Sequence, residues 1–238
     1  MAFGSAIHWS IERLFTKMKD NQNIFPPKED LVKDFNWYMK NNREAFTPEA
    51  FTLKIDYGEK ILPAYYEYHI NRWNKIVIVE KAVRNVAVQN VPINGKLDKL
   101  EFNGKQVNVV DYKTGKYENA KKKLVPPNDK EPNGGDYWRQ AVFYKILLDN
   151  DRTNDWQAVS TEFDFIEPVN DEYKTEVVQV NSADITTVTH QITDTWQKIQ
   201  NKDFKTGCGK PDCEWCNFVK SNNLVVTLHD PESDEDIN

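Results

Sequence analysis

The chain of 238 residues is long enough to bury a large core, and a composition of 39% hydrophobic residues, with seven Trp and ten Tyr, excludes wholesale disorder. It has no run of roughly eighteen apolar residues and no charged-then-apolar leader, so we expect neither a membrane span nor a signal peptide, and a cytoplasmic protein is favoured. Because the net charge is −6, any binding of nucleic acid would depend on a local basic patch.

Residues 1–74 are expected to form a helical region. Apolar side chains recur at helical spacing in three stretches, and these are 4–20, 28–41 and 47–73. A break in the third helix is expected near Gly58 and Pro63. His8 and Glu12 lie four residues apart on one stripe of the first helix. A lone histidine in such a place is more often a solvated or satisfied side chain than a ligand, so His8 by itself identifies no site.

From residue 75 the pattern changes from helical to alternating. Strands are expected over 76–80, 83–91, 93–98 and 107–113. Asn103-Gly104 predicts a hairpin between the last two strands. Because strand side chains alternate, Asp111 and Lys113 share one face, and pairing through the hairpin can bring Asp98 onto that face. Residues 75–116 are therefore the candidate catalytic strands.

Two carboxylates and a lysine on one face have a chemical use. Asp98 and Asp111 can hold Mg²⁺ or Mn²⁺ through oxygen ligands, and the Lys113 ammonium can orient a water or stabilise developing charge. The competing interpretation is a surface hairpin with an ordinary Asp–Lys ion pair, and these residues alone leave both open. Glu80 interrupts an apolar run, which indicates either a charge on an edge strand or a carboxylate near a metal.

The stretch 117–136 is expected to be a long loop beside these strands, and its lysines form the densest basic run in the chain. The candidate nucleic-acid-binding lysines are Lys121, Lys122 and Lys123 within this stretch and Lys116 just before it. A helix over 136–149 places Gln140 and Tyr144 one turn apart on one face.

The rest of the chain completes a second helix-strand-helix half over 136–202. Two strands, 156–166 and 173–180, are expected to precede a helix over 182–202. One domain is expected over 1–228, with an acidic, disordered tail over 229–238.

Four short motifs occur in a characteristic order. They are G-x-x-x-H at Gly4 to His8, G-x-x-D at Gly95 to Asp98, D-x-K at Asp111 to Lys113, and Q-x-x-x-Y at Gln140 to Tyr144. Together they resemble the PD-(D/E)xK nucleases of the RecB type, and the match spans residues 4–144.

This resemblance implies a fold and an activity. The fold would be α/β, a restriction-endonuclease-like mixed sheet of about five strands flanked by helices. The activity would be metal-dependent hydrolysis of DNA, with His8, Asp98 and Asp111 as ligands of Mg²⁺ or Mn²⁺ and Glu80 as a further candidate ligand. Gln140 and Tyr144 would face the DNA or Lys113.

The resemblance also implies a partner. A nuclease domain of this type would work in DNA repair or recombination beside a helicase, either a UvrD-like one in the same polypeptide or a separate subunit. The first motif lies close to the start of the sequence, which predicts that the chain is part of a longer polypeptide. The sequence contains no P-loop, so a motor would lie outside it.

Three cysteines follow the last predicted helix with the spacing C-x4-C-x2-C, at Cys208, Cys213 and Cys216. AddB-type relatives hold an iron-sulfur cluster with three such cysteines and a fourth that precedes the histidine helix, and this chain has no cysteine there. A cluster or a zinc ion needs four ligands, which His190 or His229 could complete for zinc. An iron-sulfur cluster, zinc and free thiols therefore remain three alternatives.

Two other classes of function also remain. The first is a catalytically inactive member of the same fold that only binds DNA. The second is a structural or interaction module built on a metal bound by the cysteines.

Overall fold

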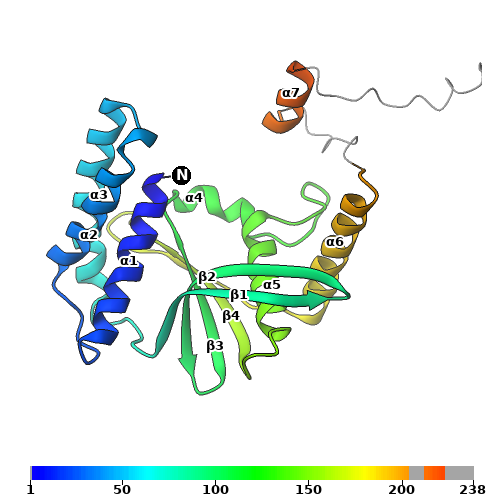
Figure 1. The fold of residues 1–238 in the computed structure, drawn as a ribbon, viewed down its shortest axis with the longest axis horizontal. Helices are drawn as coiled ribbons and strands as arrows, with labels where there is room; N and C mark the ends of the chain where they lie inside the picture. Colours follow the sequence, from blue (N-terminus) through cyan, green and yellow to red (C-terminus); the bar gives the residue numbers. More distant parts are fainter. Residues whose placement is uncertain (1, 204–211, 223–238) are drawn as a thin grey trace, which may run out of the picture. The chain divides into compact units, whose positions relative to one another are not determined.

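A computed structural model describes residues 2–203 and 212–222 (Figure 1). The elements in chain order are α1 (Ala2–Asp20), α2 (Lys28–Asn41), η1 (Arg43–Ala45), α3 (Pro48–His69), β1 (Val77–Val88), β2 (Val91–Asn103), β3 (Gln106–Lys113), α4 (Tyr117–Ala120), η2 (Lys121–Lys123), α5 (Asp136–Asp149), β4 (Gln157–Phe165), β5 (Thr175–Val178), α6 (Ser182–Gln200) and α7 (Glu214–Ser221). The chain divides into two compact units, Met1–Thr189 and His190–Asn238, and all five strands belong to the first.

The five strands form one sheet in the order β1-β2-β3-β4-β5. Neighbouring strands are antiparallel except β3 and β4, which are parallel and are connected through α5. A crossover of this kind is what a parallel pair requires. The sheet is therefore mixed and flanked by helices, which confirms the predicted α/β fold class.

Each face of the sheet carries its own hydrophobic cluster. On one face the buried side chains of α1, α2 and α3 pack with Val110 and Tyr112 of β3. On the other face Ala141 of α5 packs with Phe163 and Phe165 of β4. Because the sheet separates two cores, alternate residues of β3 lie in different environments. Asp111 lies between Val110 and Tyr112 in sequence and points to the α5 side.

The third helix is continuous, so the predicted break near Gly58 and Pro63 is wrong. Thr47 caps α3 by accepting a hydrogen bond from the Ala50 N–H, and both Gly58 and Pro63 lie within the helix. A Cβ on Gly58 would lie 2.2 Å from Cζ of the buried Phe35 of α2. The glycine is thus a point of close helix contact, and this packing outweighs its low helix propensity.

The predicted strands 76–80 and 83–91 are also wrong, because they form the single strand β1. An irregularity between Val83 and Val86 lets the strand continue past Asn85, whose φ is 58°. Such a bulge inserts an extra residue without ending the pairing. The chain reverses at Gln89 and Asn90, which both have positive φ.

Most other boundaries lie within a few residues of the predictions, but β2 runs to Asn103 where the predicted strand ended at 98, and η1 was not predicted. The stretch 117–136 contains the short helices α4 and η2, where a loop was expected, and α7 was not predicted. No helix in the described ranges combines the length and apolarity that crossing a membrane would require. The expected domain end at residue 228 and the tail over 229–238 lie outside the described residues and stay predictions.

Candidate active site

The two aspartates are brought together by the β2–β3 hairpin. The turn lies at Asn103-Gly104, as predicted, with Gly104 at a φ of 62° that suits glycine. Pairing continues from this turn to Lys99 opposite Val110. One residue farther along, Oδ2 of Asp98 accepts a hydrogen bond of 3.0 Å from the Tyr112 N–H. The Asp98 carboxylate is therefore held on the β3 backbone, directly beside Asp111.

Asp111 is the centre of a dense polar network. Its Oδ1 accepts hydrogen bonds of 2.8 Å from the Tyr144 hydroxyl and 2.8 Å from Nε2 of Gln140. Its Oδ2 lies 2.7 Å from Nζ of Lys113, which also donates to Oε1 of Gln140 at 2.8 Å. Gln140 and Tyr144 reach one carboxylate because their spacing places them on one face of α5. The network thus joins the D-x-K strand to the Q-x-x-x-Y helix.

Burial and charge raise the pKa of Asp111. Loss of hydration is the largest cause and the negative charge of Asp98 adds to it, whereas Lys113 and the hydrogen bond from Tyr144 act in the opposite direction. Burial, followed by the charge of Asp111, also raises the pKa of Tyr144, so its hydroxyl keeps its proton and remains a donor. A second positive charge between the two carboxylates would relieve their mutual repulsion.

His8 joins the cluster from α1. Its Nδ1 lies 3.1 Å from Oδ2 of Asp98, and its ring meets the edge of Tyr112 with 6.1 Å between centroids. Burial lowers the pKa of His8, but the hydrogen bond that His8 donates to Asp98 and the charges of Asp98 and Asp111 outweigh it, so the pKa is raised overall. His8 therefore lies in the electrostatic field of both carboxylates and next to the candidate site.

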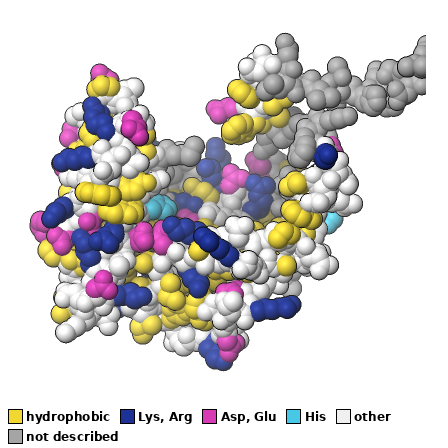
Figure 2. Space-filling model, in the orientation of Figure 1, with side chains coloured by type: hydrophobic (Ala, Val, Ile, Leu, Met, Phe, Trp, Pro, Cys, Tyr) yellow, Lys and Arg dark blue, Asp and Glu magenta, His cyan; other side chains and the backbone are white. Residues whose placement is uncertain are grey.

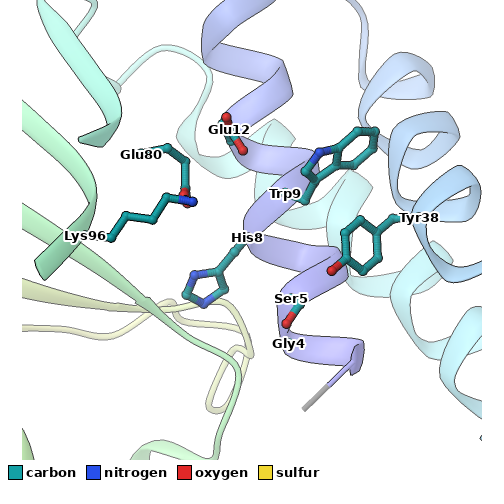
Figure 3. A pocket seen from close by; sticks show the side chains of 8 residues that line it. All are labelled: Gly4, Ser5, His8, Trp9, Glu12, Tyr38, Glu80 and Lys96. Atoms are coloured by element: carbon teal, nitrogen blue, oxygen red, sulfur yellow. The ribbon is translucent and has the colours of Figure 1, made fainter. Parts of the chain in front are cut away.

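Glu80 lies apart from this network. Its carboxylate forms an ion pair with Lys96, and its backbone has a φ of 52°, which is strained for a non-glycine residue. Both side chains line a pocket with His8 (Figure 3). The structure thus places Glu80 near the histidine but already paired with a lysine.

Two lysines of the 117–136 stretch make cation–π contacts with tyrosine rings near the site. Lys121 lies over the ring of Tyr117 at 5.3 Å, and Lys123 lies over the ring of Tyr137 at 5.1 Å. The same Tyr137 ring is 4.3 Å from Nζ of Lys113. Tyr137 was not identified from the sequence, although its place one turn before Gln140 on α5 was an available signal.

The other two predicted lysines also belong to this region. Lys116 is the residue that precedes α4, and Lys122 is exposed in η2. These lysines and tyrosines connect the D-x-K strand with the exposed part of the 117–136 stretch.

The donor atoms of the site suit a hard divalent cation. Oδ2 of Asp111 is buried, and among the described residues it has an ion pair with Lys113 but accepts no hydrogen bond of good geometry. Within the described ranges, no three His, Cys, Asp or Glu side chains are arranged as a ready set of metal ligands. Mg²⁺ commonly uses only one or two carboxylates and keeps several waters, a requirement that Asp98 and Asp111 can meet.

The cysteines belong to the second unit, and only two of the three lie among the described residues. Cys213 precedes α7 and Cys216 lies within it, whereas Cys208 and His229 are outside the described residues. An iron-sulfur cluster or zinc at these cysteines stays a prediction.

The sequence matches the family described as "PD-(D/E)XK nuclease superfamily" over residues 1–221. A search of curated proteins found no match. Among solved structures, a "Putative exonuclease" from Eubacterium rectale is 11% identical with a TM-score of 0.48, over 89% of this chain and 85% of that chain. The structure of SSO0001 is 13% identical with a TM-score of 0.36, over 84% of this chain and 76% of that chain.

Proposed function

Because the chain belongs to the PD-(D/E)XK nuclease superfamily, we propose that it hydrolyses phosphodiester bonds in DNA with the help of Mg²⁺ or Mn²⁺. The single observation that carries this proposal is the network on Asp111, in which Lys113, Gln140 and Tyr144 all contact one buried carboxylate beside Asp98. A surface ion pair would not need a buried carboxylate with three partners, so the interpretation as an ordinary hairpin is disfavoured.

In this proposal Asp98 and Asp111 would hold the cation, and His8, whose Nδ1 contacts Asp98 in the structure, would complete the protein ligands. When bound, such an ion polarises the phosphodiester and lowers the pKa of a water. Glu80 would reach the cation only if its ion pair with Lys96 opened, so we assign it no role in the structure as described.

The remaining residues of the network orient the reacting groups and stabilise the charge that develops on the phosphate. Lys113 holds the attacking water or stabilises the charge that develops on the phosphate, because its ammonium lies 2.7 Å from the Asp111 carboxylate. Gln140 positions Lys113 by accepting its hydrogen bond, and Tyr144 fixes the orientation of Asp111 through its hydroxyl. These groups are rigidly held because each makes contacts on two elements, β3 and α5.

The spacing of Gln140 and Tyr144 on α5 supports a nuclease of the RecB type. We further propose that such a nuclease works in DNA repair or recombination beside a helicase, which would lie in the same polypeptide or in a partner subunit. A non-cleaving DNA-binding member of the fold is the second candidate function. We favour the enzyme because the polar residues of the four motifs are present and those of the network are bonded to one another.

A cleavage assay tests the proposal. End-labelled single-stranded and double-stranded DNA should be cut in the presence of Mg²⁺ or Mn²⁺ and left intact when a chelator is present. If no cation supports cleavage of either substrate while DNA still binds, the non-cleaving alternative is correct.

The lysine run is expected to guide the DNA strand to the site. Replacing Lys121, Lys122 and Lys123 together by alanine should weaken DNA binding at low salt. On single-stranded DNA, the slope of the logarithm of the binding constant against the logarithm of the salt concentration should become shallower by roughly 0.7 for each phosphate contact that is lost. The measurement is the dissociation constant at a series of salt concentrations.

The matched control removes the same charge elsewhere. Lys28, Lys105 and Lys174 are already paired with Glu67, Asp155 and Glu172, so their joint replacement should change the slope less. Equal slopes for the two triple variants would mean that the run is only a solvated segment.

A further inference from the structure

A pocket beside His8 is not explained by the hydrolytic network. Its volume is about 370 Å³, within the range of roughly 300–1,000 Å³ that is typical of small-molecule sites. Helix α1 contributes Gly4, Ser5, His8, Trp9 and Glu12 to it (Figure 3). Since His8 also contacts Asp98, whatever occupies the pocket lies next to the proposed cation site.

One side of this pocket is aromatic. Tyr38 of α2 lies beside Trp9, with 5.5 Å between ring centroids. Trp37 stacks on Trp9 at 4.9 Å with an angle of 20°, and it is itself 56% exposed. Figure 2 shows hydrophobic side chains gathered at the surface over α1 and α2, next to a histidine and to charged side chains. Trp37 and the Arg13 guanidinium, 5.9 Å from the ring centroid, hold Trp9 in place, and Tyr38 is the second aromatic side chain that lines the pocket.

The polar side of the pocket disfavours a phosphate. Glu80 and Lys96 neutralise each other in an ion pair. Within the described part of the chain, the Glu12 carboxylate has neither an ion pair nor a side-chain hydrogen bond, so it contributes a net negative charge and an available acceptor. A flat, neutral ring that carries N–H donors fits this combination of an aromatic wall and a carboxylate.

We propose that this pocket binds one unpaired nucleobase of the DNA strand that is cleaved, which packs against Tyr38 and Trp9 and donates a hydrogen bond to Glu12. The proposal rests on the proposed function, because a strand whose phosphate lies at Asp98 and Asp111 passes the His8 side of the site. The base must be unpaired, since a base within a duplex is stacked on both faces and paired along its edge. The substrate class is therefore single-stranded DNA or a frayed duplex end.

A binding experiment without cleavage tests this inference. Fluorescence anisotropy in the presence of a chelator compares a labelled oligodeoxycytidylate with an abasic strand of the same length. The wild-type protein should bind the base-bearing strand about fivefold or more tightly than the abasic strand, because stacking on an aromatic side chain favours binding. Tyr38→Leu should bring this ratio close to one.

Tyr68→Leu is the matched control, because Tyr68 is also a surface tyrosine on a helix, 37% exposed, and does not line the pocket. It should keep the wild-type ratio. Equal binding of the two strands by the wild type, or an unchanged ratio in Tyr38→Leu, would overturn the inference and leave the proposed function standing. If neither strand binds under any salt condition, the proposed DNA substrate fails as well.

Discussion

Asp111→Asn is expected to lower metal-dependent DNA cleavage by on the order of 10²–10³-fold or more while the protein stays folded. Asparagine has nearly the shape of aspartate, and its side-chain carbonyl can still accept the hydrogen bonds that Tyr144 and Gln140 donate. It lacks the negative charge that the proposed cation and Lys113 require. The measurements are the rate of cleavage of labelled DNA with Mn²⁺ and the midpoint of thermal unfolding.

Lys113→Met should have a similar effect on the rate for a different reason. It keeps most of the aliphatic stem but removes the ammonium that lies between Asp111 and Gln140. Asp155→Asn is the matched control for the first variant, because this carboxylate is 80% exposed and lies outside the network. Wild-type rates in Asp111→Asn or Lys113→Met would show that the network is structural and would remove the basis of the proposed function.

Among the variants considered, Lys99→Met is expected to lower the free energy of unfolding most, by about 3–5 kcal/mol. Lys99 has no role in the proposed cleavage reaction. Its side chain is only 2% exposed, forms an ion pair of 2.8 Å with Glu101, and lies over the rings of Phe15 and Tyr112. Removing this charge leaves the Glu101 and Asp164 carboxylates without the ammonium that offsets their negative charge. Urea unfolding at several pH values measures the effect.

The pH dependence of this loss follows from Asp164. Burial raises its pKa to about 6, although a hydrogen bond from Tyr65 and the charge of Lys99 both act to lower it. A carboxyl group whose pKa is raised by folding stabilises the native state when protonated, and this contribution is lost as the pH rises through the folded-state pKa. Without Lys99 the pKa rises further, so the deficit of Lys99→Met should be larger near pH 8 than near pH 5.

Two further variants test whether the loss of stability is due to the buried charge. Glu101→Gln in the Lys99→Met background removes the nearest orphaned charge and should recover part of the lost stability. Lys105→Met changes a lysine that is 70% exposed, and it should leave the unfolding free energy almost unchanged. Equal effects of Lys99→Met and Lys105→Met, with no dependence on pH, would contradict the buried-charge explanation.

The sequence by itself determined the local geometry on which the site depends. Alternation along a strand places Asp111 and Lys113 on one face, and Asn103-Gly104 defines the turn that brings Asp98 beside them. The four-residue spacing of Gln140 and Tyr144 predicts that they share a face. These relationships depend on neighbours in the chain, so periodicity and turn chemistry were sufficient to predict them.

Only the tertiary structure decided the features that depend on contacts between distant elements. Gly58 has the sequence signature of a helix break, and its contact with Phe35 of another helix explains why α3 continues. In the same way, the bonding of Tyr65 to Asp164, 99 residues away, and the pairing of Glu80 with Lys96 have no local pattern.

The aromatic pocket was decided in the same way. Trp9 and Tyr38 are ordinary helical residues in the sequence, and they line one pocket with His8 only because α1 packs on α2. The physical reason is that a side chain's direction along its own element follows from backbone geometry, whereas its partner across an interface is selected by the packing of the whole core.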